Sequence, residues 1–140
     1  MSVLRRSIVL LALALAAIAP AGASAAHSVG TPEQIAWVRS AATRFVTAEL
    51  AGNGAAACGI LNAPLRATSH HRTCEQRQDA RLKGMLKSRA ARAHLHAQLH
   101  EIPKATVVVH GNVASLDLKT PLLHGPNRFL WTEMCWMLEG

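Results

Sequence analysis

Residues 105–118 read ATVVVHGNVASLDL, and the pattern of this stretch decides the fold. Two β-rich runs flank Gly111-Asn112, a two-residue link typical of a β-hairpin with a type II′ turn. Pairing across this turn sets Val109 opposite Ala114 and Val107 opposite Leu116, so one face of the hairpin is entirely aliphatic. The other face carries Thr106, Val108, His110, Val113, Ser115 and Asp117. The sequence therefore predicts an antiparallel hairpin in this register.

Downstream of the hairpin, the sequence predicts a loop over 121–127 and one final strand over 128–138. This strand is apolar on both faces, with Phe129, Trp131, Cys135 and Met137 on one face and Leu130, Met134, Trp136 and Leu138 on the other. A strand of this kind needs cover on both sides. We therefore expect a short, three-stranded sheet that forms a homodimer or binds a partner. The alternative is that the helices and the 121–127 loop cover the strand.

Upstream of the hairpin, the apolar residues follow the spacing of a helix. Thr31-Pro32-Glu33-Gln34 combines an N-cap, a proline at the first helical position and a capping-box glutamine. Apolar residues then recur every three or four positions, at Ile35, Val38, Ala42 and Phe45. The helix is expected to end at Gly52.

Further helices are expected between this helix and the hairpin. A short helical stretch over 55–61 precedes the break that Pro64 imposes. Thr73-Cys74-Glu75-Gln76 repeats the capping-box pattern and predicts a helix that starts near Cys74. The pattern leaves open whether this helix continues over 94–100, and Pro103 stops it. Helices followed by an antiparallel sheet indicate the α+β class.

The first 25 residues have the pattern of a cleavable signal peptide. Arg5 and Arg6 precede an unbroken apolar run of eleven residues, 8–18, which is too short to cross a bilayer comfortably. Ala23-Ser24-Ala25 is a small-residue cleavage site, so we expect cleavage after Ala25 or one residue later. A linker at 26–30 and one domain at 31–140 follow. The mature protein is then secreted or periplasmic without a lipid anchor; an uncleaved membrane anchor is the alternative.

The three cysteines, Cys58, Cys74 and Cys135, would then lie in an oxidising compartment, where a disulfide is expected. They allow three single pairings and leave one thiol over. We favour Cys58–Cys74, because both residues lie in adjacent predicted helical segments. Cys135 is expected to be a free thiol buried in the final strand. The alternative is a reactive or dimer-linking cysteine.

The order of these features resembles the nuclear transport factor 2-like (cystatin-like cone) proteins, in particular their small exported bacterial members. The resemblance covers about residues 31–138. It rests on the helix from Val38 to Phe45, the segment Ala-Gly-Asn-Gly-Ala-Ala-Ala-Cys at 51–58, the cysteine at the next helix start, the Val-rich hairpin and the Trp-bearing final strand. The resemblance implies helices that close one side of a curved sheet and leave a cone-shaped pocket. Members include isomerases, dehydratases, cyclases and non-catalytic binding domains, so the fold does not decide the function.

Two hypotheses for function follow from this pattern. The leading one is an exported, non-catalytic binding or interaction module, with a small apolar pocket or a sheet-mediated dimer. Its pocket would be lined by Val38, Phe45, Leu86, Trp131 and Glu133. The second is a small acid/base enzyme of the isomerase or dehydratase type, because a carboxylate in an apolar pocket has a raised pKa. Its candidate residues are Glu133, Asp117 and His110, although a surface position for Glu133 is the simpler interpretation.

A third hypothesis is metal or haem binding by the histidines that precede Pro103, which are His94, His96 and His100. If this segment is helical, His96 and His100 lie one turn apart and could hold one metal ion. The segment lacks a zinc signature, so solvated surface histidines are the simpler interpretation, and we predict no cofactor.

Basic residues are concentrated over 66–92, where only Glu75 and Asp79 oppose them. Asp79 is expected in the first turns of a helix, where a carboxylate offsets the helix dipole. In an exported protein, this charge favours weak contact with an anionic envelope surface, although a solvated basic face is the simpler interpretation. No aromatic residue interleaves with these charges, which argues against nucleic acid. The basic residues are Arg66, Arg72, Arg77, Arg81, Lys83, Lys87, Arg89 and Arg92.

Overall fold

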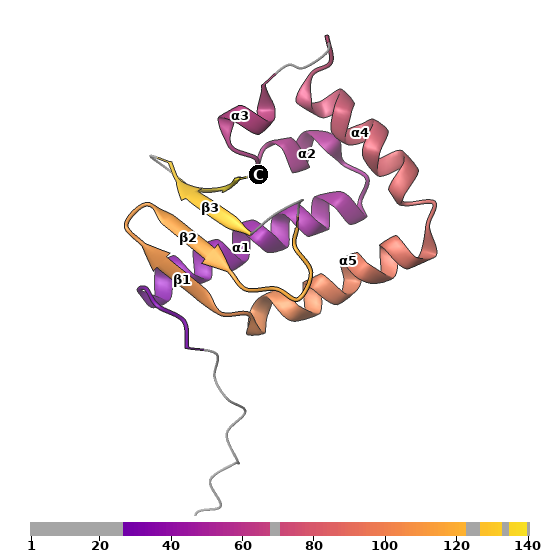
Figure 1. Cartoon of the computed structure of the whole chain (residues 1–140). Helices are drawn as coiled ribbons and strands as arrows, with labels where there is room; N and C mark the ends of the chain where they lie inside the picture. The colour runs from indigo at the N-terminus through magenta and orange to yellow at the C-terminus, as the bar shows by residue number, and fades with distance from the viewer. Residues whose placement is uncertain (1–26, 68–70, 123–126, 133–134, 140) are drawn as a thin grey trace, which may run out of the picture.

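The longest helix, α1 (Pro32–Leu50), lies against the sheet and also contacts the helices that follow it (Figure 1). In this computed structural model the described residues are 27–67, 71–122, 127–132 and 135–139. They form five α-helices, one short 3-10 helix and a four-stranded antiparallel sheet, which confirms the predicted α+β class. The predicted export segment, 1–25, lies outside the described residues.

The capping boxes confirm the two predicted helix starts. The Thr31 side chain accepts a hydrogen bond from the Gln34 backbone, and the Gln34 side chain accepts one from the Thr31 backbone. The same reciprocal pair begins α4 (Cys74–Met85), between Thr73 and Gln76. Each box satisfies two backbone donors that a helix start otherwise leaves unpaired.

The remaining helices follow local start signals. Asn53 caps α2 (Gly54–Cys58). Pro64 occupies the first turn of α3 (Ala63–Arg66), so this proline begins a helix as well as ending the stretch before it. Ser88 caps α5 (Arg89–Glu101). The residues over 94–100 therefore belong to a separate helix rather than to a continuation of α4, and the 3-10 turn at Ile102–Lys104 leads into the sheet.

The sheet is a meander in which β1 (Val107–His110), β2 (Val113–Leu116), β3 (Arg128–Trp131) and β4 (Trp136–Glu139) are hydrogen-bonded in sequence order. The predicted hairpin register is confirmed, because Val107 pairs with Leu116 and Val109 pairs with Ala114. Gly111 has a φ of 59°, which the first position of the predicted turn requires and which glycine adopts without strain.

The prediction of one final strand in a three-stranded sheet is wrong. The chain reverses between Trp131 and Trp136, and both the backbone N–H and the hydroxyl of Thr132 donate to the Cys135 carbonyl at 2.9 Å. Trp131 then pairs with Trp136, so the two side chains share a face instead of lying on opposite faces. Among the described residues, Phe129, Trp131, Trp136 and Leu138 therefore share one face, while Leu130 and Met137 lie on the other. The expected homodimer or partner stays a prediction.

Both edges of the sheet are covered by other parts of the chain. Val29 exchanges two backbone hydrogen bonds of 2.8 Å with β1, through Val107 and Val109. At the other edge, the Leu138 N–H donates to the Ile60 carbonyl at 2.8 Å. Part of the predicted 26–30 linker is thus bound to the sheet. Covered edges leave few free backbone groups on which another chain could add a strand.

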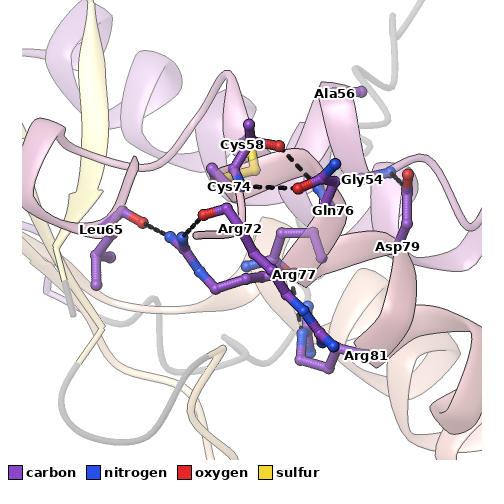
Figure 2. Close-up of a disulfide and its surroundings, with 12 residues drawn as sticks. Gly54, Ala56, Cys58, Leu65, Arg72, Cys74, Gln76, Arg77, Asp79 and Arg81 are labelled. Atoms are coloured by element: carbon purple, nitrogen blue, oxygen red, sulfur yellow. Dashed lines mark hydrogen bonds between the residues drawn. A yellow bond between two sulfur atoms is a disulfide. The ribbon is translucent and has the colours of Figure 1, made fainter. Parts of the chain in front are cut away.

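The predicted disulfide Cys58–Cys74 is confirmed, with the two Cα atoms 6.0 Å apart (Figure 2). Beside it, the Asp79 carboxylate accepts a hydrogen bond of 3.0 Å from the Gly54 N–H, so Asp79 caps α2 from a neighbouring helix. The Arg77 guanidinium donates to the carbonyls of Arg72 and Leu65, both at 2.9 Å. These contacts hold α2 and α3 against α4.

Cys135 is a free thiol, as predicted, but its predicted burial is wrong. The residue lies at the end of the β3–β4 turn rather than inside a strand, and it is exposed there. Its Sγ lies 3.3 Å from the Met137 Sδ.

We expect replacement of both Cys58 and Cys74 by Ala to lower the free energy of unfolding by about 3 kcal/mol, because the link closes a loop of sequence separation 16. Urea denaturation followed by circular dichroism measures the loss. Cys135→Ala is the control and should change the stability by less than about 0.5 kcal/mol, since this cysteine is exposed. An equal loss in the control would contradict the prediction.

Two glycines on the α2–α4 pair should respond to alanine in opposite directions. A Cβ at Gly54 would meet the Asp79 carboxylate and approach its backbone nitrogen to 2.8 Å, so Gly54→Ala should destabilise by about 1–3 kcal/mol. Gly84 lies in α4 with nothing within 4 Å of the added carbon, so Gly84→Ala should stabilise by about 0.5–1 kcal/mol. Thermal unfolding of the two variants tests the pair, and a shift of the same sign in both would refute the α2–α4 contact.

Candidate functional site

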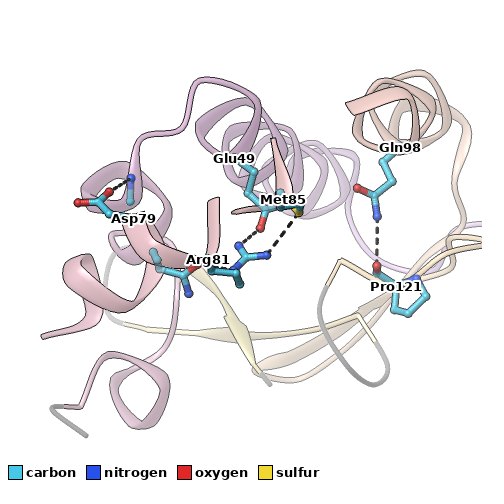
Figure 3. A network of polar contacts seen from close by, with 8 residues as sticks. Glu49, Asp79, Arg81, Met85, Gln98 and Pro121 are labelled. Carbon is cyan, nitrogen blue, oxygen red and sulfur yellow. Dashed lines mark hydrogen bonds and ion pairs between the residues drawn. The ribbon is translucent and has the colours of Figure 1, made fainter. Parts of the chain in front are cut away.

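A pocket of about 550 Å³ lies among α1, α4, α5 and the segment 120–122. Its apolar walls are contributed by Met85, Leu95, Pro121 and Leu122. Its polar groups come from three helices that are far apart in the sequence, as Figure 3 shows for Glu49, Arg81 and Gln98. An apolar pocket with a few polar groups is the usual form of a small-molecule site.

Glu49 is the buried charge of this pocket. It lies in the last turns of α1, on the same stripe as the buried residues Val38 and Phe45, and only 2% of it is exposed. An ion pair with Arg81 of α4 accompanies this burial (Figure 3). A carboxylate buried alone would be costly, so the guanidinium is the group that makes the ionised form tolerable here.

Arg81 is held in place by its own helix. Its Nε donates to the Gln78 side chain at 2.9 Å, while its terminal nitrogens reach Glu49 and the Met85 sulfur. The Arg81 side chain remains 39% exposed. One end of the ion pair therefore faces water, and the other end lies in the protein interior.

The pKa of the Glu49 carboxyl is raised above its ordinary value of 4.5. Desolvation by burial is the largest cause, because it penalises the charged form. The hydrogen bond and the charge of Arg81 act in the opposite direction and offset this only in part. The site can therefore take up a proton at a higher pH than an exposed glutamate can.

Gln98 supplies a second buried polar group, with 3% of it exposed. Its Nε2 donates to the carbonyl of Pro121 at 3.1 Å and to that of Thr120 at 3.4 Å. Because a carbonyl can only accept, these bonds fix which end of the amide is the nitrogen. The Oε1 is left buried without a partner among the described residues. A hydrogen-bond donor in the pocket would remove the cost of that unpaired acceptor.

The four predicted pocket residues that the structure describes belong to or pack against the core and do not line the Glu49 pocket. Val38 and Phe45 are fully buried in the core, and Leu86 is a half-buried residue packed against it. Trp131 also packs against this core, and it is stacked on Trp37. Glu133 lies outside the described residues.

The predicted acid/base and metal candidates are also dispersed. His110 is exposed at the end of β1, and Asp117 lines a separate surface pocket with His100. His94 lines the Glu49 pocket, whereas His96 is exposed. Within the part of the chain that the structure describes, no three His, Cys, Asp or Glu side chains gather in a way that could hold a metal ion.

Several of the basic residues have structural partners. Arg77 and Arg81 are engaged by the contacts described above, and Arg92 donates to the Leu86 carbonyl. Charge in the segment 66–92 is thus used partly to hold α4 and the α4–α5 turn, which leaves fewer free cations for an anionic surface.

Sequence reasoning missed Glu49 and Gln98, although both leave a signal. Glu49 follows Phe45 by four positions and so continues the apolar stripe of α1 with a charged residue. Gln98 stands three positions after Leu95 and four before Ile102, on the buried stripe of α5. A polar residue that continues an apolar stripe is expected to be buried and paired.

Comparison with known proteins leaves the family open. No family model, no curated protein and no solved structure matches this chain. Among the described residues, no helix is long and apolar enough to span a membrane.

We expect Glu49→Gln to remove a pH dependence of stability. Because the folded-state pKa of Glu49 is raised, the folded protein binds more protons than the unfolded chain above pH 4.5. The wild-type protein should therefore lose stability relative to the variant as the pH rises from 4.5 through the folded-state pKa. Urea unfolding of both proteins across this range measures the difference. A gain of the wild type over the variant would show that Arg81 outweighs the burial.

Proposed function

We propose that this protein is an exported, non-catalytic binding module whose pocket holds a small amphiphile that carries a hydrogen-bond donor. The observation that carries the proposal is the buried, unpaired Gln98 Oε1 in a pocket whose walls include Met85, Leu95, Pro121 and Leu122. The apolar walls would take the body of the ligand, and Gln98 Oε1 would accept from its donor.

Export is supported by two independent features. Residues 1–25 have the charge, the apolar run and the small-residue site of a signal peptide. The Cys58–Cys74 disulfide is of a kind that persists in oxidising compartments. We therefore infer a secreted or periplasmic location for the mature protein.

The resemblance to the nuclear transport factor 2-like family remains a proposal. It is supported by the order of helices before sheet and by the long helix α1 packed on one face of an antiparallel sheet. In this proposal the Glu49 pocket takes the place of the ligand pocket of the family's cone, although α4 and α5 rather than the sheet supply most of its walls.

The acid/base enzyme is the second candidate, and the raised pKa of Glu49 favours it. Glu49 replaces Glu133 and Asp117 as the carboxylate to test. The ion pair with Arg81 makes binding the better proposal, because a general base needs a free lone pair directed at the substrate. Glu49→Gln distinguishes the two functions, since a binding module retains its ligand and an acid/base enzyme loses turnover.

Straight-chain primary alcohols and their methyl ethers of matched length test the proposed donor. We expect the alcohol to bind more tightly than the ether by about 1–3 kcal/mol, roughly 5- to 150-fold, because only the alcohol can donate to Gln98 Oε1. Isothermal titration calorimetry on the purified mature protein measures both affinities.

Two matched variants locate the binding. Met85→Trp fills the pocket from α4 and should abolish binding of both probes. Lys83→Trp places the same side chain on the exposed side of α4 and should leave binding unchanged. Equal affinities for alcohol and ether, or binding that survives Met85→Trp, would contradict the proposal.

A further inference from the structure

All three tryptophans of the chain gather in one corner of the molecule, away from the Glu49 pocket. Trp37 of α1 stacks on Trp131 of β3, with ring centroids 5.3 Å apart and 7° between the planes. Trp136 of β4 meets Trp131 edge-on, at 5.4 Å and 61°. The β3–β4 turn creates this corner, because it brings Trp131 and Trp136 side by side on the face toward α1.

The stack is not sealed into the core. Trp37 is 45% exposed, which is unusual for so large an apolar side chain. A pocket of about 160 Å³ lies on one side, lined by the three tryptophans together with Ser40, Arg44 and Cys135. A smaller pocket of about 100 Å³ lies toward Gln34 and Gly111. A cavity of about 150 Å³ can accommodate one benzene ring, so the larger pocket has the size of a single ring.

The polar groups of the larger pocket are mostly hydrogen-bond donors. Trp136 is 4% exposed, and its Nε1–H is buried without a partner among the described residues. An indole N–H can only donate, so it requires an acceptor. Arg44 adds a guanidinium and Ser40 a hydroxyl, while none of the described residues that line the pocket is acidic. This set of groups suits an anion with acceptor oxygens.

We propose that the tryptophan corner is a second ligand site, which takes a single-ring aromatic carboxylate. The ring stacks against the exposed indoles, where offset and edge-on aromatic pairs are favourable. The carboxylate lies within reach of the Arg44 guanidinium and accepts from the buried Trp136 N–H. This site is separate from the Glu49 pocket, whose unpaired group is an acceptor and which selects a donor instead.

Benzoate is the probe, and the protein carries its own reporter. The chain has no tyrosine, so its fluorescence arises from the three tryptophans of the proposed site. We expect saturable quenching by benzoate with one equivalent bound. Cyclohexanecarboxylate keeps the charge without the flat ring, and benzyl alcohol keeps the ring without the charge. Each should bind about tenfold more weakly, which corresponds to the loss of one favourable contact.

Substitutions at two exposed residues of the pocket, Trp37 and Arg44, test their roles in benzoate binding, which calorimetry measures. Trp37→Leu removes the stacking face and Arg44→Gln removes the cation, and each should weaken benzoate binding about tenfold. Arg89→Gln makes the same change of charge at an exposed position of α5 outside the pocket and should have no effect. Met85→Trp, which fills the Glu49 pocket, should also leave benzoate binding unchanged.

Cys135 gives a second readout on the unmodified protein. It is the free thiol that lines the pocket, so bound benzoate should slow its reaction with a maleimide. This measurement tests the proposed site even where a variant fails to fold.

The proposal is overturned by the absence of saturable binding, by unprotected Cys135 at saturation, or by benzoate binding that Met85→Trp weakens. Affinity for cyclohexanecarboxylate equal to that for benzoate would overturn the aromatic part of the assignment. Affinity for benzyl alcohol equal to that for benzoate would overturn the anionic part.

Discussion

The disulfide between α2 and α4 is the constraint on which the rest of the helical half depends. Cys74, Gln78, Arg81 and Met85 recur at spacings of four, three and four, so they lie along one face of α4. A link at the first residue of the helix therefore fixes the direction in which that face points. The Asp79–Gly54 contact sets how closely the two helices approach. Together they place Arg81 beside the end of α1, where Glu49 would otherwise be a buried charge without a counterion.

The two proposed ligand sites differ in whether their unpaired buried group accepts or donates a hydrogen bond. The Glu49 pocket has one unpaired acceptor, Gln98 Oε1, whereas the tryptophan corner has one unpaired donor, the Trp136 Nε1–H, among aromatic rings. A buried polar group without a partner costs stability, and evolution retains such groups most readily where something else completes them. The two pockets share no lining residue, so a ligand in one would not contact the residues that line the other.

The hairpin register, the two capping boxes and the disulfide could be predicted from sequence because each depends on neighbouring residues. Gly111-Asn112 specifies its own turn, and Thr31 and Thr73 each find their partner three positions later. The segment between Trp131 and Trp136, where the chain reverses, contains no glycine, proline or asparagine. These residues favour turns, so the local sequence does not predict the reversal. The polar contacts of Glu49 join α1 to α4 across the molecule. Spacing shows that this residue faces inward, but the three-dimensional packing decides what it meets.

The attachment of Val29 to β1 has a consequence for how the protein matures. Ser28 and Val29 are already bound to the sheet, through hydrogen bonds to Val107 and Val109. Cleavage after Ala25 would leave only two residues, Ala26 and His27, ahead of the first anchored one, Ser28. The amino terminus would then be very short. A peptidase that removed a few more residues would also remove Val29 and leave the edge of β1 without its backbone hydrogen bonds. If residues 1–25 are removed on export as proposed, the position of the cut therefore decides whether the edge of β1 keeps its Val29 partner.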